Sequence, residues 1–181
     1  MDMREVHISS TYYYHGKIIN MKVDDVRMPD GTVAKREEVE HPGGSCVAAL
    51  TPSNELLFVR QFRYAYDEEV LELPAGKLEP GEDPQIAMAR ELSEETGCTS
   101  DHFIFLGNAY PTPGYTNEML RIWACRITNE GTQHLDEGEF LEVERIPLNE
   151  AVDMVMRGEL PDCKTQIGVL KAARLVEEGK L

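Results

Sequence analysis

Apolar and polar residues alternate along much of the chain, which is the pattern of half-buried strands. In the first 40 residues, two alternating runs flank the turn sequence "PDG" and predict strands at 16–28 and 32–39. Short apolar runs between turn residues predict buried strands at 45–50, 55–62 and 68–76. Similar runs predict further strands at 102–110, 119–127 and 139–147.

Helical spacing and end signals predict a helix between Asp83 and Gly97. Asp83 is a good N-cap acceptor, the following proline suits the first turn, and Gly97 suits a left-handed C-terminal position. Two more helices are expected at 148–158, with Asn149 as the N-cap, and at 164–179. This order of elements predicts an α/β protein, with a mixed sheet that helices cover on both faces.

The helix between Asp83 and Gly97 carries three glutamates on one face. At about 100° per residue, Glu91, Glu94 and Glu95 lie together, and an apolar stripe of Ile86, Ala89 and Leu92 lies opposite. Each like-charge pair destabilises a helix by roughly 0.2–0.5 kcal/mol, and the C-terminal end of the dipole disfavours anions. A solvated acidic face is the simplest alternative. A divalent cation explains the cluster better, and carboxylate oxygens suit Mg²⁺ or Mn²⁺.

The charge and the cysteines exclude several classes of protein. A net charge of −15 argues against a partner that is nucleic acid or an anionic membrane, since both attract basic proteins. An anionic substrate would then need a metal ion or local arginines. Four scattered cysteines, with no apolar leader and no apolar run of 18 residues, predict a reduced cytoplasmic protein without a membrane span.

Two other hydrolase motifs fail at particular positions. Gly76 and Gly81 have the spacing of a phosphate-binding loop, but Glu82 and Asp83 follow where that loop needs Lys and Ser or Thr. Ser45 lacks the glycine pattern of a serine hydrolase. The five histidines show no ligand spacing.

The same segment matches the Nudix box, G-x5-E-x7-R-E-U-x-E-E-x-G-U, in which U is a bulky aliphatic residue. The matching residues are Gly76, Glu82, Arg90, Glu91, Leu92, Glu94, Glu95 and Gly97. Cys98 at the last U is a mild departure. The chain therefore resembles the Nudix hydrolases, a resemblance that implies an α-β-α sandwich with a mixed sheet.

The resemblance also implies a catalytic site that binds Mg²⁺ or Mn²⁺. The implied metal ligands are the carboxylates of Glu91, Glu94, Glu95 and Glu139 and the backbone carbonyl of Ala75. The resemblance also implies that Arg90 holds Glu82 and the glutamates in place. The implied catalytic residues are Glu82, Arg90, Glu94 and Glu139.

Segments outside the box resemble the ADP-ribose pyrophosphatase branch. These are "RQFR" at 60–63, "ELPAGKLEPGE" at 72–82 and "PGYTNE" at 113–118, whose proline follows Gly97 by 16 residues. The implied reaction is hydrolysis of ADP-ribose to AMP and ribose 5-phosphate. GDP-mannose or another nucleoside-diphosphate sugar is an alternative substrate, and an ADP-ribose sensor is a weaker alternative because the glutamates are intact. The implied substrate-binding residues are Arg60, Arg63, Glu72, Gly76, Pro113, Gly114 and Glu118. For Arg60 and Arg63, ordinary strand-end charges remain the alternative.

Three further expectations follow from the branch. The general base is expected on the "DEGEF" loop at Glu139, with Glu142 in reserve and a solvated carboxylate as the alternative for either. Tyr12, Tyr13, Tyr14 or Trp123 could stack on the base, although such aromatics are more often core. We expect residues 1–42 to form a β-rich dimerisation arm of a homodimer and residues 43–181 to form the hydrolase domain.

Overall fold

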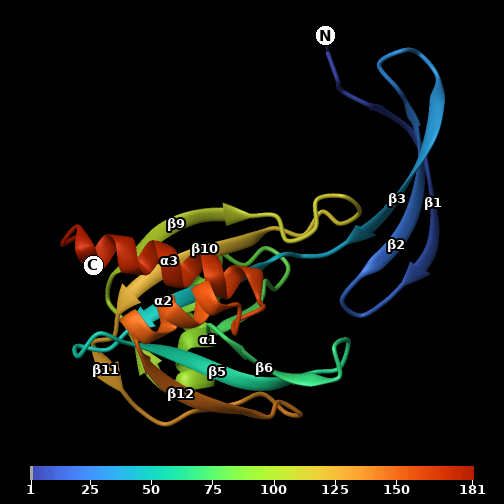
Figure 1. The fold of residues 1–181 in the computed structure, drawn as a ribbon. Helices are drawn as coiled ribbons and strands as arrows, with labels where there is room; N and C mark the ends of the chain where they lie inside the picture. Colours follow the sequence, from blue (N-terminus) through green and yellow to red (C-terminus); the bar gives the residue numbers. More distant parts are fainter. Residues whose placement is uncertain (1) are drawn as a thin grey trace. The chain divides into compact units, whose positions relative to one another are not determined.

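The protein forms two compact units, which the computed structural model describes over residues 2–181 (Figure 1). The first unit contains the residues up to Gly43 together with the loop Tyr110–Met119. The second unit contains Gly44–Ala109 and Leu120–Leu181. The loop therefore belongs to the first unit although it connects two strands of the second.

The first unit is a three-stranded antiparallel sheet in the order β1-β2-β3. Its strands are β1 (Val6–His15), β2 (Asn20–Arg27) and β3 (Val33–Glu40). Every residue of β1 is exposed. The loop Tyr110–Met119 joins β3 through a parallel bridge between Val39 and Thr116. In that bridge, the Val39 amide donates to the Tyr115 carbonyl at 2.8 Å and the Asn117 amide donates to the Val39 carbonyl at 3.3 Å.

The second unit is built on a seven-stranded sheet with the central order β12-β5-β4-β10-β9. Strand β10 runs parallel to β4, and the other pairs are antiparallel, so the predicted mixed sheet is confirmed. Strands β6 and β7 pair with β5 and β4. The strands are β4 (Gly44–Leu50), β5 (Glu55–Arg63), β6 (Glu68–Glu72), β7 (Ala75–Lys77), β9 (Phe103–Ala109), β10 (Leu120–Arg126) and β12 (Leu141–Pro147). A separate two-stranded ribbon pairs β8 (Cys98–Thr99) with β11 (Asn129–Glu130).

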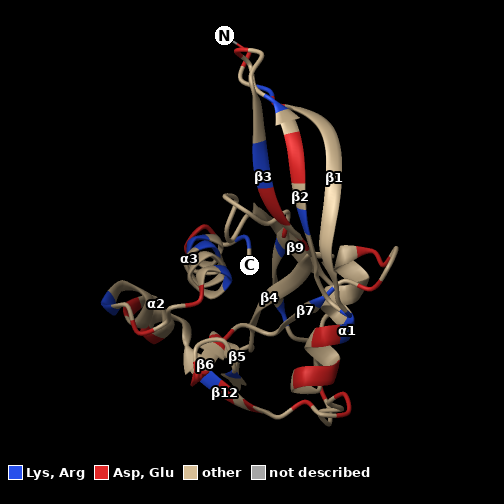
Figure 2. Cartoon of the chain, turned by 90° about the vertical axis from the view of Figure 1, so that its right-hand side faces the viewer, with Lys and Arg blue, Asp and Glu red and all other residues tan. Residues whose placement is uncertain are grey.

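Helices cover both faces of this sheet, as predicted (Figures 1 and 2). They are α1 (Pro84–Thr96), α2 (Leu148–Arg157) and α3 (Cys163–Glu177). Strand β4 is buried along its whole length because successive side chains enter opposite cores. Val47 and Ala49 lie in the cluster with α1, whereas Ala48 and Leu50 lie in the cluster with α2 and α3.

Several predicted boundaries differ from the structure, among them the strand expected at 16–28, which spans Asn20–Arg27. The expected strand 68–76 is two strands, since the chain passes from pairing with β5 to pairing with β4 at Leu73 and Pro74. The N-cap of α2 is Pro147, and Asn149 lies inside the first turn. The helix follows β12 directly, since β12 pairs with β5 as far as Pro147, and the amide of Leu148 donates to the Asn54 carbonyl at 2.9 Å.

Candidate active site

Local signals determine both ends of α1. The Asp83 carboxylate accepts hydrogen bonds from the amides of Gln85 and Ile86 at 2.9 and 3.2 Å. Pro84 occupies the first turn, where its missing N–H costs nothing. Gly97 ends the helix with φ 71°, a left-handed conformation that favours glycine. The predicted caps are therefore confirmed.

The buried face of α1 differs from the predicted apolar stripe. Ile86 is 65% exposed, so the expectation that it belongs to the buried stripe is wrong. Met88 and Leu92 pack in the core, and Glu95 is buried with them at 3% exposure. The helix is rotated so that part of its acidic face turns inward. An ordinary amphipathic helix would place that face in solvent.

Arg90 is the main charge partner of the acidic face. Its Nη1 donates to Glu91 Oε1 at 2.9 Å and to Glu94 Oε2 at 2.8 Å. Its Nε donates to Glu82 Oε1 at 3.1 Å, which joins the loop before α1 to the helix. One guanidinium therefore binds three carboxylates. This cluster of Glu82, Arg90, Glu91 and Glu94 keeps a net negative charge.

Strand β7 lies against two of the carboxylates, those of Glu91 and Glu95. The Ala75 amide donates to Glu95 Oε2 at 2.9 Å. A Cβ at Gly76 would lie 1.8 Å from Glu91 Oε1, so only glycine lets this backbone approach the carboxylate so closely. Ala75 and Gly76 are themselves held in the sheet opposite Cys46 and Ser45 of β4. The sheet thus supplies a rigid backbone floor beneath two of the glutamates.

Burial and crowding disfavour negative charge at this site. Burial raises the pKa of Glu95 to about 8, and the negative charges of Glu91 and Glu139 add to the rise, against the Ala75 amide. Burial also raises the pKa of Glu91. Arg90 lowers this pKa, whereas the negative charges of Glu94 and Glu139 raise it further. The site therefore holds more carboxylate than its one nearby arginine can balance.

The donor chemistry fits a hard divalent cation. Carboxylate and carbonyl oxygens are the ligands that Mg²⁺ prefers, and a cation would relieve the raised pKa of Glu95. Within residues 2–181, no three Asp, Glu, His or Cys side chains are spaced as a ready metal site. Arg90 binds one oxygen of Glu91 and one oxygen of Glu94.

Glu139 and Glu142 lie in different electrostatic surroundings. Glu139 is exposed on the loop before β12, beside Gly138 with φ 87°, and its charge acts on both Glu91 and Glu95. Glu142 is exposed on β12, opposite Arg60 of β5. The charge of Glu139 is therefore among those that act most strongly on Glu91 and Glu95.

The two predicted arginines form different ion pairs on β5. Arg60 Nε donates to Glu144 Oε1 at 2.5 Å at a half-exposed position. Arg63 makes a two-pronged contact, from Nε to Glu72 Oε1 at 2.5 Å and from Nη2 to Glu72 Oε2 at 2.6 Å. Glu72 is 2% exposed, whereas the Arg63 side chain is 40% exposed. Arg63 thus combines a fixed inner edge with access to solvent.

Lys164, a buried lysine near the start of α3, was not predicted from the sequence as a functional residue. Its Nζ contacts Glu72 Oε2 and lies 3.0 Å from Asp162 Oδ2. It is 7% exposed. A signal was available, because a lysine two residues after an acidic N-cap has a carboxylate partner close at hand.

Three predicted substrate-binding residues belong to the first unit. Pro113, Gly114 and Glu118 all lie in the loop Tyr110–Met119. Glu118 Oε1 lies 3.6 Å from His41 Nδ1 in the same unit. Their role in binding substrate stays a prediction.

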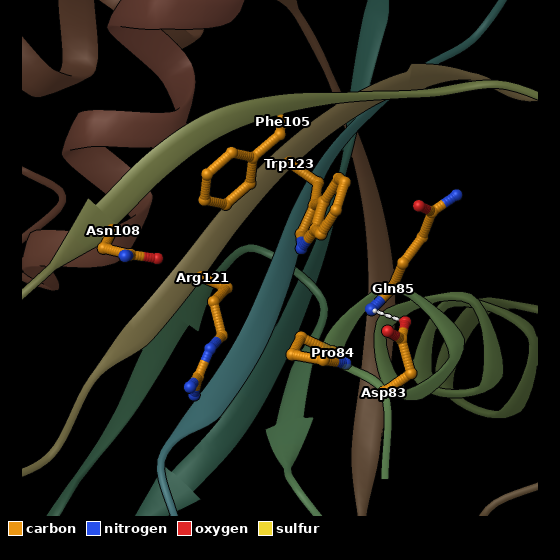
Figure 3. A pocket seen from close by; sticks show the side chains of 7 residues that line it. All are labelled: Asp83, Pro84, Gln85, Phe105, Asn108, Arg121 and Trp123. Carbon is orange, nitrogen blue, oxygen red and sulfur yellow. Dashed lines mark hydrogen bonds between the residues drawn. The ribbon is translucent and has the colours of Figure 1, made fainter.

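The predicted stacking aromatics divide between the two units. Tyr12 donates from its hydroxyl to Glu40 Oε1 at 2.9 Å and stacks on His15, with ring centroids 4.8 Å apart. Trp123 packs beside Phe105 at 4.8 Å and donates to Ser45 Oγ at 3.0 Å. Figure 3 shows Trp123 and Phe105 lining a pocket of about 280 Å³ with Asp83, Pro84, Gln85, Asn108 and Arg121.

Comparisons with known proteins identify the family. The NUDIX domain profile matches residues 39–164, and the profile of the nucleoside diphosphate sugar hydrolase N-terminal domain matches residues 7–39. The chain therefore belongs to the Nudix family, as its resemblance to the Nudix box implied, and it is a Nudix hydrolase. A crystal structure described as ADP compounds hydrolase shares the fold, with a TM-score of 0.83, 18% identity and 100% coverage of both chains. The expected Nudix fold is thereby confirmed.

Several curated relatives match nearly the whole chain. An ADP-ribose pyrophosphatase of Bacillus subtilis is 36% identical, over 92% of this chain and 91% of the relative. A methanol dehydrogenase activator of Bacillus methanolicus is 35% identical, over 91% and 90%. A GDP-mannose pyrophosphatase of Escherichia coli K12 is 27% identical, over 78% and 80%. Within residues 2–181, each helix is too short or too polar to cross a bilayer.

Proposed function

We propose that this protein hydrolyses the pyrophosphate of ADP-ribose to AMP and ribose 5-phosphate, with Mg²⁺ or Mn²⁺ as cofactor. The observation that carries the proposal is the inward-facing acidic cluster of α1, backed by the β7 backbone at Ala75 and Gly76. Its setting in a Nudix domain, and the name of the Bacillus subtilis relative, support the choice of substrate.

The chemistry needs positive charge at the pyrophosphate and a base for the attacking water. Glu91, Glu94, Glu95 and the Ala75 carbonyl would hold the divalent cation, which supplies charge neutralisation and activation of water. Arg90 and the Ala75 amide orient these side chains before the cation arrives. Arg63 would bind a phosphate oxygen with its solvent-facing edge, since its inner edge is committed to Glu72.

Glu139 is the proposed general base, with Glu142 in reserve. Two features support Glu139: its charge acts on Glu91 and Glu95, and it lies on an exposed loop that a glycine at position 138 bends. In the reaction it would accept a proton from the water that attacks the phosphorus. Arg60, which is engaged with Glu144, would make a smaller contribution to substrate binding than Arg63.

A panel of substrates tests the proposed reaction. Purified protein with Mg²⁺ is given ADP-ribose, GDP-mannose, NADH or a diadenosine polyphosphate, and the products are separated by anion-exchange chromatography. We expect the highest kcat/KM on ADP-ribose, with AMP and ribose 5-phosphate in equal amounts and no turnover in EDTA. Equal rates on all four substrates would contradict the proposal. A clear preference for GDP-mannose would favour the alternative that the Escherichia coli relative represents.

We also propose that residues 1–42 are the dimerisation arm of a homodimer. Strand β1 exposes apolar side chains along its length, including Val6 at 60%, Ile8 at 45% and Tyr13 at 65%. Such an edge strand usually pairs with or is covered by another chain. Size-exclusion chromatography with light scattering is expected to give twice the chain mass, and a monomer at micromolar concentration would contradict the arm's role.

The proposed compartment is the cytoplasm. All four cysteines have free thiols, and three of them, Cys46, Cys98 and Cys125, are buried. Unpaired cysteines in separate positions are typical of reducing compartments. Thiol titration of protein purified without reductant should then give four free thiols after unfolding, and any disulfide in the freshly purified protein would count against this placement.

A further inference from the structure

A buried network joins the start of α3 to the end of β6, and it extends beyond the residues of the Nudix box. Asp162 is the N-cap of α3, and its Oδ2 accepts bonds from the Thr165 amide at 2.9 Å and the Thr165 hydroxyl at 2.6 Å. The Thr165 hydroxyl in turn accepts the Leu73 amide at 2.9 Å. Thr165 has no exposed surface, so this connection is fully shielded from water.

A second branch of the network runs from the same N-cap to Arg63. Lys164 Nζ lies between Asp162 and Glu72, and Glu72 holds the guanidinium of Arg63 with both oxygens. The two positive and two negative groups balance. Although burial alone lowers the pKa of Lys164, Asp162 and Glu72 raise it, so the ammonium stays charged. A buried network of paired charges holds its side chains in one arrangement, because any other arrangement would leave a buried charge without a partner.

The two branches meet in the backbone that carries the candidate active site. Glu72 and Leu73 are consecutive, and the chain continues through Pro74, whose carbonyl accepts the Val47 amide at 3.0 Å. Ala75 and Gly76 follow directly and contact the catalytic glutamates. A shift at position 73 would therefore be passed on to the floor of the site within three residues.

Close packing at Gly168 secures the same contact. A Cβ at this position of α3 would lie 2.4 Å from Leu73 Cδ1, so a larger residue would have to displace the Leu73 side chain. Because Gly168 is one turn beyond Thr165, the helix contacts Leu73 twice, once by a hydrogen bond and once by backbone-to-side-chain packing.

The geometry points to Asp162, Lys164 and Thr165 as positioning residues of the hydrolase: Lys164 fixes Arg63 through Glu72, and Thr165 fixes the Leu73–Gly76 backbone. None of the three needs to touch the substrate. The role of Lys164 rests on the proposed function, since it acts on the arginine that would bind phosphate. The role of Thr165 is a property of the folded chain and does not depend on the substrate.

A double-mutant cycle tests the branch through Lys164. In Lys164→Met the KM for ADP-ribose should rise roughly tenfold with a smaller change in kcat, because Arg63 loses its fixed orientation. In an Arg63→Ala background the same change should have no further effect on KM. Lys164→Arg should restore much of the binding. Lys171→Met is the matched control, since it removes the same charge from α3 at an exposed lysine that bonds only the Leu106 carbonyl.

Hydrogen exchange tests the branch through Thr165 without substrate or metal. In Thr165→Val, loss of the hydroxyl removes its hydrogen bonds with the Leu73 amide and with Asp162. Exchange of the Leu73 and Ala75 amides should then be roughly three- to tenfold faster. Amides in the middle of α2 serve as the internal control and should not change.

Each result bears on one step of the inference. An unchanged KM in Lys164→Met, or an equal loss in the Arg63→Ala background, would overturn the role of Lys164. Unchanged exchange at Leu73 and Ala75 would overturn the role of Thr165. If the wild-type protein does not hydrolyse ADP-ribose, the proposed function fails instead, and the exchange result still decides whether α3 positions the floor.

Discussion

Replacing Glu95 by Gln should remove activity while making the metal-free protein more stable at neutral pH. The side chain is almost fully buried, and its pKa is raised from 4.5 to about 8. The folded state therefore keeps a proton that the unfolded chain loses above about pH 4.5. Gln has the same shape, can still accept the Ala75 amide, and never has to carry the buried charge.

The size of the effect follows from proton linkage. Where the folded pKa is raised, the folded state binds more protons than the unfolded state, so stability falls as pH rises through this window. Each pH unit costs about 1.4 kcal/mol. Between about pH 5 and pH 7 the wild-type protein should lose roughly 2–3 kcal/mol that the Gln variant keeps. The difference in stability between the Gln variant and the wild type should be close to zero below about pH 4.5. It should stop growing near the pKa of Glu95 in the folded state, about 8.

Urea unfolding in EDTA at several pH values measures this difference. The free energy of unfolding of Glu95→Gln minus that of the wild type is plotted against pH, so that the titration of groups that do not interact with Glu95 cancels. Glu137→Gln, on the exposed loop before β12, is the control for loss of one carboxylate. A difference that stays flat from pH 5 to pH 8 would refute the reasoning. Activity with Mg²⁺ should fall at least roughly a hundredfold in the same variant, because one ligand is lost.

Two other variants test separate parts of the site. Gly76→Ala should lower kcat strongly, because the new Cβ would lie 1.8 Å from Glu91 Oε1 and must displace that carboxylate. Near-normal kcat in this variant would show that the close approach is not needed. Glu139→Gln should lower kcat roughly 10²–10⁴-fold with little change in KM, as expected for loss of a general base, while Glu142→Gln should stay close to wild type. If kcat falls in Glu142→Gln and stays near wild type in Glu139→Gln, the general base is Glu142 instead.

Local signals were enough to predict the helix that carries the site. Asp83, Pro84 and Gly97 act within a few residues, so their effects can be seen in the sequence, and the fixed spacing of the Nudix box identified the family. The mixed sheet also followed from the order of elements.

Tertiary packing decided what the sequence could not show. Helical periodicity placed Ile86 in an apolar stripe opposite the three glutamates, yet the packing of α1 exposes Ile86 and buries Glu95. Similarly, β12 pairs with β5 as far as Pro147, which makes Pro147 rather than Asn149 the N-cap of α2. Lys164 was missed because its partner Glu72 is 92 residues away in the chain. Contacts of this length leave no periodic trace.

The pairing of the loop Tyr110–Met119 with β3 has a consequence for how members of this family can exchange parts. The loop arises between β9 and β10, yet its hydrogen bonds are made with the arm. An arm transplanted from a relative would bring a new β3 without the loop that matches it. Viable chimaeras should therefore require two grafted segments, and insertions in one should be accompanied by changes in the other.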